Sequence, residues 1–177
     1  MAVRGGPYPL AVTTLGIDPG IAAWGFGVVR RSGSRVKLLE YGCYRTPAGE
    51  ATALRLKRIH DEMASLIERH EPETVALEES YVGADPRIAL GVGQARGAVL
   101  VACAAAGVAC TEYAPATVKQ AVCGYGRADK AQVQRMVRAI LRLDGDPQPH
   151  HAADALAVAI CHALAAPPLE LAAGRRR

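Results

Sequence analysis

The chain has 177 residues and a net charge of +4; half of its residues are hydrophobic and 21% are charged. This composition argues against an intrinsically disordered protein, and the length predicts one globular domain with a buried core. Its longest uncharged apolar run, residues 97–110, has 14 residues, fewer than the roughly 18 that a membrane-spanning helix needs. No secretory signal is recognisable, and the five cysteines contain no CxxC pair, so we expect a cytoplasmic protein with reduced thiols rather than a disulfide framework or a zinc ribbon.

Three strands joined by short links are predicted in the first quarter of the chain. Residues 11–18 (AVTTLGID), 25–30 (GFGVVR) and 36–45 (VKLLEYGCYR) have strand composition, and the turn-rich RSGSR joins the second to the third. We expect these strands to form an antiparallel meander. A helix follows, because apolar residues from Leu56 to Ile67 recur on one face of a 3.6-residue period.

The rest of the chain alternates two short strands with helices. The predicted elements are a strand at 74–79, a helix at 86–107, a strand at 110–114, a helix at 115–122, a helix around 133–141 and a last helix from about Pro149. This order predicts the α/β class, with a mixed sheet flanked by helices. We expect one domain over residues 11–166, a disordered tail at 1–10 and a flexible basic tail at 167–177.

Three carboxylates stand at positions where α/β proteins place chemistry. Asp18 ends the first strand before a Pro-Gly turn, although it could merely cap that turn. Glu78 and Glu79 end the fourth strand and point to opposite faces, so only one can share a face with Asp18. Asp154 lies among apolar residues of the last helix, where an unpaired carboxylate would be costly to bury. Gathered in one cleft, three acids would suit hard divalent cations that promote phosphodiester hydrolysis.

Basic residues are concentrated in one segment. Between Pro115 and Asp144 the chain carries six basic residues and two acidic ones, an excess equal to the net charge of the whole chain. The basic residues are Lys119, Arg127, Lys130, Arg135, Arg138 and Arg142. A solvated helix face would explain this run, but a localised excess also favours a polyanionic partner such as nucleic acid.

Five motifs resemble the RuvC family, the Holliday-junction resolving endonucleases with an RNase H-like fold. They are LGIDPGIAAWGFGVV, ALEESY, GVGQARGAVLVA, VKQAVCGYGRADKAQVQRMV and HHAADALAVAICH, and they occur in family order over about residues 13–163. The resemblance implies a five-stranded mixed sheet, a homodimer, four-way junction DNA as substrate and a RuvA–RuvB branch-migration complex as partner. The small-residue helix between Ala89 and Gly97 could pack against the second subunit, or equally against the sheet.

The resemblance also assigns roles to single residues. Asp18, Glu78 and Asp154 match the family's catalytic acids, which bind Mg²⁺ or Mn²⁺. Lys119 and Lys130 match basic residues implicated in DNA contacts. Tyr81 matches an aromatic residue that stacks on bases near the junction centre, although a core tyrosine is the alternative. Arg127 lies in the same basic segment, and we expect it to contact phosphates as well.

The start of the last helix departs from the family pattern. Many members have Asp-x-x-Asp there, whereas this chain has His151 three residues before Asp154. The spacing puts both side chains on one helix face, so we expect His151 to be the fourth metal ligand, although the spacing does not exclude His150. Because Mn²⁺ accepts nitrogen ligands more readily than Mg²⁺, we expect cleavage to be faster with Mn²⁺.

The resulting hypothesis is an endodeoxyribonuclease that resolves four-way DNA junctions by paired symmetric nicks, using two metal ions, in recombination and repair. Two alternatives remain open at this point. One is a catalytically impaired junction-binding protein in which His151 marks lost catalysis, and the other is a RuvC-like nuclease that processes ribosomal RNA precursors. The preferred cleavage sequence and the dimer interface are not written in any motif of the chain.

Overall fold

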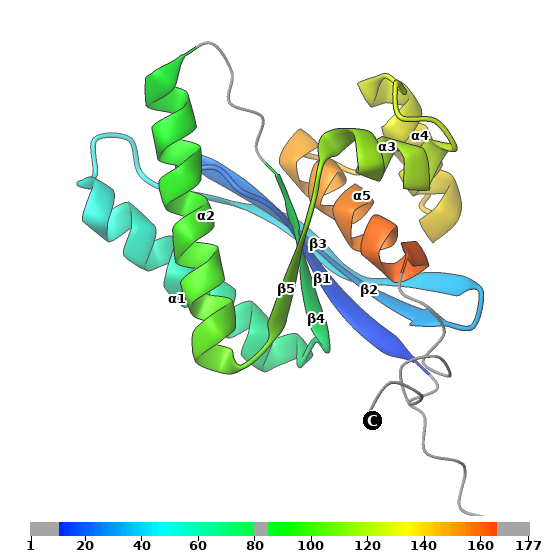
Figure 1. Cartoon of the computed structure of the whole chain (residues 1–177), viewed down its shortest axis with the longest axis horizontal. Coiled ribbons are helices and arrows are strands. Elements are labelled where there is room, and N and C mark those ends of the chain that lie inside the picture. The colour runs from blue at the N-terminus through cyan, green and yellow to red at the C-terminus, as the bar shows by residue number, and fades with distance from the viewer. Residues whose placement is uncertain (1–10, 80–84, 166–177) are drawn as a thin grey trace, which may run out of the picture.

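The computed structural model describes residues 11–79 and 85–165, which contain five strands and five helices (Figure 1). The strands are β1 (Val12–Asp18), β2 (Ala23–Ser32), β3 (Arg35–Arg45), β4 (Thr74–Glu78) and β5 (Ala109–Tyr113). The helices are α1 (Thr52–His70), α2 (Pro86–Ala106), α3 (Pro115–Cys123), α4 (Lys130–Leu141) and α5 (His150–Ala165). Each predicted strand and helix is therefore present, with ends that differ by a few residues.

One mixed sheet runs through the middle of the domain, in the order β3-β2-β1-β4-β5. The first three strands pair antiparallel, which confirms the predicted meander, and β4 and β5 add in parallel to β1 and to β4. Parallel addition needs crossover helices, and α1 and α2 supply them. A tight turn with Gly33 at a φ of 59° joins β2 to β3, in the left-handed region that glycine favours.

The helices cover the two faces of the sheet as separate layers. Figure 1 shows α1 and α2 on one side and α3, α4 and α5 on the other. Leu15 and Ile17 of β1 are fully buried in the core beneath α1 and α2. The side-chain alternation of the strand turns Gly16 toward α5 instead.

Helix α5 lies directly on the backbone of β1 and β2, because glycines leave room for it. A Cβ on Gly16 would come within 2.2 Å of the carbonyl oxygen of Ala155, and one on Gly25 within 1.9 Å of that of His151. Both distances are far shorter than any permitted contact. The glycines of β1 and β2 thus set how closely the first turn of α5 approaches the end of β1.

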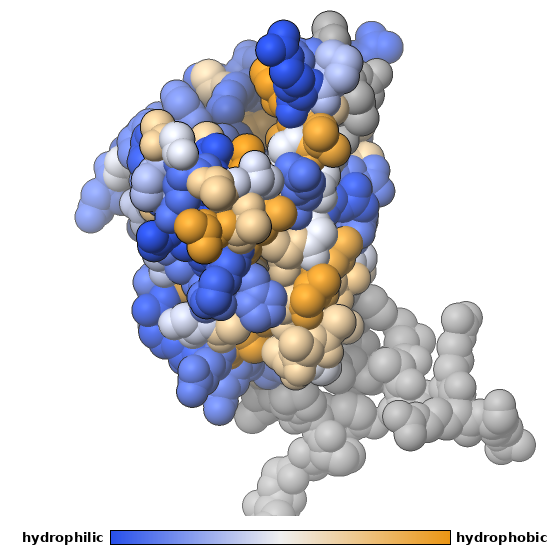
Figure 2. Space-filling model, turned by 90° about the vertical axis from the view of Figure 1, so that its left-hand side faces the viewer, coloured by the Kyte–Doolittle hydropathy of each residue, from blue (hydrophilic) through white to orange (hydrophobic). Residues whose placement is uncertain are grey.

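Helix α2 leaves part of its apolar surface uncovered. Val99 and Cys103 are buried against α1 and the sheet, whereas Ile88, Leu90 and Val101 are more than half exposed. Figure 2 shows hydrophobic patches among hydrophilic residues on the face that α1 and α2 cover. By length and composition alone, residues Pro86–Ala105 could cross a membrane, and 28% of the most apolar window is buried inside the domain. This finding differs from the sequence prediction, which counted only uncharged runs.

Candidate active site

Two of the predicted acids meet because their strands are neighbours. Strands β1 and β4 run in parallel, with Ile17 opposite Leu77, so Asp18 and Glu78 lie side by side at the C-terminal ends of these strands. Glu78 is partly buried, whereas Glu79 is exposed and its backbone N–H donates to the carbonyl oxygen of Tyr113. Of the two adjacent glutamates, Glu78 therefore belongs to the candidate site.

The first turn of α5 brings the predicted histidine to the same end of the sheet. His151 Nδ1 lies 2.6 Å from Asp18 Oδ2, across 133 residues of sequence. His150 points elsewhere, and its Nδ1 lies 2.9 Å from the amide nitrogen of Gln134 on α4. The spacing of the sequence left both histidines open, and the structure places only His151 against the Asp18 carboxylate.

Helix α4 adds a lysine to the carboxylates. Lys130 Nζ donates to Asp154 Oδ2 at 2.8 Å. Lys130 is the first residue of α4, and the helix start is fixed by a capping box in which Asp129 and Gln132 bond each other's backbone. Lys130, which we expect to contact DNA, thus contacts the carboxylate of Asp154, a candidate catalytic acid. The spacing of these residues in the sequence did not indicate this contact.

Burial and mutual contacts change the pKa values of the groups at this end of the sheet. Burial raises the pKa of Asp18, although the hydrogen bond from His151 opposes that rise. Burial raises the pKa of Glu78 to about 7, and the negative charges of Asp18 and Asp154 add to the rise. The hydrogen bond to Asp18 raises the pKa of His151. Because neighbouring carboxylates repel each other when they are all ionised, a bound cation would stabilise their ionised forms.

The donor set has the chemistry of a divalent-metal site but not yet its arrangement. Carboxylate oxygens are the preferred ligands of Mg²⁺, and an imidazole nitrogen is accepted by Mn²⁺. Within the described ranges, no three His, Cys, Asp or Glu side chains form a ready-made metal-binding group. The contacts His151–Asp18 and Lys130–Asp154 occupy the carboxylates instead. The residue types therefore fit a divalent metal ion, which would have to displace both contacts before it could bind.

The other predicted DNA-binding residues have different outcomes. Lys119 on α3 is near enough to the site for its charge to act on Glu78. Arg127 is exposed in the link between α3 and α4 and takes no part in the carboxylate cluster. Tyr81 lies outside the described residues. The sequence analysis did not predict that glycines make room for α5 on the sheet, although the alternating glycines of GFG in β2 could have indicated it.

Comparison with known proteins identifies the family. A family model described as "Crossover junction endodeoxyribonuclease RuvC" matches residues 14–162. The chain belongs to the RuvC family. RuvC of Moorella thermoacetica is 52% identical over 153 residues, which cover 86% of this chain and 92% of that relative. RuvC of Chloroflexus aggregans is 51% identical over 156 residues, which cover 88% and 95%.

A solved RuvC structure has the same fold. The structure of T. thermophilus RuvC in complex with a Holliday junction substrate superposes with a TM-score of 0.83 at 44% identity, and the match covers 86% of this chain and 93% of that one. The predicted RNase H-like class and the resemblance to RuvC are thereby confirmed. The match spans β1 through α5, so every residue of the candidate site lies within the RuvC homology.

Proposed function

We propose that this chain resolves four-way DNA junctions by paired symmetric nicks, in recombination and repair. The observation that supports the proposal is the contact of His151 with Asp18, in a chain matched to RuvC over nearly its whole fold. The charges of Asp18 and Asp154 also act on Glu78. The relatives are named as crossover junction endodeoxyribonucleases, and one related structure holds a Holliday junction.

The four residues would hold two divalent metal ions, Mg²⁺ or Mn²⁺. When bound, such ions activate a water molecule for attack on phosphorus and stabilise the leaving oxygen. Asp18 and Glu78 must be ionised to bind them, and the raised pKa of Glu78 makes that state harder to reach without a cation. Lys130, once released from Asp154, is placed to neutralise a DNA phosphate beside the acids.

His151 is the proposed nitrogen ligand of this site. Its contact with Asp18 supports that role, because a ligand must lie beside the other ligands before the metal binds. Replacing a carboxylate by an imidazole removes one negative charge and shifts preference toward metals that accept nitrogen. We therefore expect faster cleavage with Mn²⁺ than with Mg²⁺.

DNA would bind across the face formed by α3, the α3–α4 link and the start of α4. Lys119 and Arg127 supply positive charge there, and Lys119 lies close enough to act on Glu78. Phosphate contacts of this kind set affinity and register rather than sequence choice. The proposal keeps Tyr81 as a base-stacking residue on the strength of the resemblance alone.

Paired nicks require two active sites, and the exposed face of α2 offers a surface for a second subunit. Leu90 and Val101 are more than half exposed and lie on one side of α2, and a second copy of the chain would bury them around a two-fold axis. This face supports the homodimer expected from the family. A RuvA–RuvB branch-migration complex is retained as a partner on the family resemblance alone.

The test is a substrate panel for the purified chain. A labelled four-way junction with a mobile core, the matching linear duplex and an RNA hairpin are incubated with Mg²⁺, Mn²⁺ or a chelator. We expect paired symmetric nicks in the junction alone, faster with Mn²⁺ and absent with chelator. Junction binding without cleavage in either metal would support an impaired junction-binding protein, and cleavage of the hairpin would support an RNA-processing nuclease; either result contradicts the proposal.

A further inference from the structure

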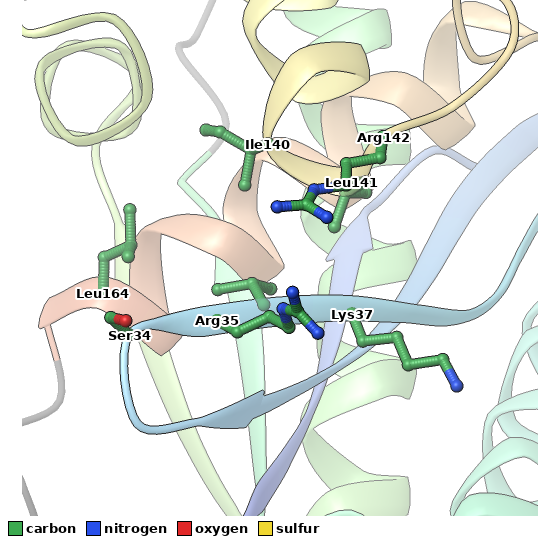
Figure 3. A pocket seen from close by; sticks show the side chains of 8 residues that line it. Ser34, Arg35, Lys37, Ile140, Leu141, Arg142 and Leu164 are labelled. Carbon is green, nitrogen blue, oxygen red and sulfur yellow. The ribbon is translucent and has the colours of Figure 1, made fainter.

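A pocket of about 660 Å³ opens at the end of the sheet away from the carboxylates. It is bounded by the start of β3, the C-terminal end of α4 and the last turn of α5 (Figure 3). Its apolar side chains include Val36, Ile140 and Leu164, and Leu164 is 42% exposed. The volume falls within the range of about 300–1,000 Å³ that is common for ligand pockets.

Among the described residues, the lining of the pocket is positively charged and contains no acid. Arg35, Lys37 and Arg142 are among the eight lining residues, none of which is Asp or Glu. Figure 3 shows the guanidinium groups of Arg35 and Arg142 directed into the space between β3 and α4, while Lys37 extends away. Two like charges aimed at one space repel each other, so an anion between them would be stabilised.

Position separates this pocket from the candidate active site. Leu164 lies ten residues beyond Asp154 on α5, which is about 15 Å along the helix axis. The end of β2 next to the β2–β3 turn pairs with the start of β1, where Val12 is opposite Arg31, whereas Asp18 lies at the other end of β1. A ligand in the pocket therefore need not touch the residues that cut DNA.

Arg142 ends α4 in a left-handed C-cap, and its side chain is not held by other described residues. Arg142 follows the last residue of α4 with a φ of 56°, in the left-handed conformation that glycine adopts most easily at helix ends. Its side chain makes no ion pair or hydrogen bond with any described residue that would offset the strain. Among the described residues, the side chain of Arg142 is therefore available to contact a ligand.

We propose that this pocket binds an acidic peptide segment of a partner protein, with its carboxylates between Arg35 and Arg142 and an apolar side chain on Ile140 and Leu164. Guanidinium groups bind carboxylates with two parallel hydrogen bonds, which suits an aspartate or glutamate. The apolar side chains of Ile140 and Leu164 favour a peptide over DNA. A peptide can bury them against an apolar side chain, whereas a sugar-phosphate backbone would place charged groups on them.

The test measures binding of a short fluorescent peptide that alternates aspartate and leucine, by anisotropy, to the full chain. Matched probes replace leucine by serine or aspartate by lysine. We expect saturable binding of the first peptide alone, weakened at least about tenfold by Arg142→Gly and by Arg35→Gln. The control variant Lys57→Gln, on α1 across the sheet, should leave binding unchanged.

Arg142→Gly also guards against a folding artefact. Because glycine fits the left-handed position, the variant should keep or raise the Tm while it loses the peptide. Absence of saturable binding to the unaltered chain overturns the proposal, and so does equal binding by Arg142→Gly. Weaker junction binding by Arg142→Gly would assign the pocket to DNA, and a lower mass in solution would assign it to a second subunit; both results also overturn it.

Discussion

The two ends of the sheet carry opposite charges and are neutralised to different degrees. At the carboxyl ends of β1 and β4, acids gather beside internal cations, so that Asp18 meets His151 and Asp154 meets Lys130. At the β2–β3 turn, Arg35 and Arg142 face a pocket that no acid lines within residues 11–79 and 85–165. The acidic end therefore has to exchange an internal cation before it can bind a metal ion, whereas the basic end can bind an anion without any exchange.

The largest expected effect comes from breaking the acidic end. Asp18→Asn removes a charge that interacts with Glu78, His151 and Asp154, while it keeps the size of the side chain. We expect junction cleavage to fall roughly 1,000-fold, as for loss of a central electrostatic group, with little change in junction binding. Single-turnover cleavage and a gel-shift titration measure the two quantities. Retained cleavage would show that the chemistry takes place elsewhere.

A smaller effect should come from moving α5 without touching any charged group. Gly25→Ala places a Cβ against the backbone carbonyl of His151, so α5 must shift from the sheet and carry the histidine with it. We expect a loss of stability of about 1–3 kcal/mol and a loss of cleavage of about 100-fold. The control is Gly145→Ala, where a Cβ would meet no atom within 4 Å. Equal effects of the two variants would contradict the role of the glycine platform.

Without metal, the free energy of unfolding should depend on the protonation of the acidic end. The pKa of Glu78 is about 7 in the folded chain and near 4.5 when unfolded, so its ionisation opposes folding as the pH rises from about 4.5 to above 7. The free energy of unfolding should fall by up to about 3 kcal/mol over that range.

Denaturant unfolding in chelator, at several pH values, measures this change. The raised pKa values of Asp18 and His151 act in the same direction, so the informative quantity is the difference from Glu78→Gln. We expect that variant to lose less stability than the unaltered chain as the pH rises. An equal pH dependence of the free energy of unfolding in the two proteins would show that ionisation of Glu78 does not destabilise the fold.

Much of this architecture could be predicted because it depends on local patterns. Strand composition and helical periodicity gave the element order, and the ends of β1 and β4 indicated Asp18 and Glu78. Contacts across the fold could not be read in the same way. The ion pair joins Lys130 to Asp154, 24 residues later in the sequence, and its geometry depends on how α4 packs against α5. Spacing alone likewise could not separate His150 from His151.

The pocket at the basic end was equally hidden from the sequence. Arg35 and Arg142 are more than 100 residues apart, and only the packing of the β2–β3 turn beneath the end of α4 brings them to one space. In the sequence, Arg142 belonged to a basic run that favoured nucleic acid. The structure separates it from Lys119 and Lys130, which lie toward the carboxylates.

The most direct test of the metal centre is pulsed electron paramagnetic resonance of bound Mn²⁺, which detects the nuclear spin of a nitrogen ligand. We predict a histidine nitrogen signal in the unaltered chain that persists in His150→Gln and disappears in His151→Gln, while Mn²⁺ still binds to the three carboxylates. A signal that survives in His151→Gln, or a chain that binds no Mn²⁺, would contradict the metal centre proposed for Asp18, Glu78, His151 and Asp154.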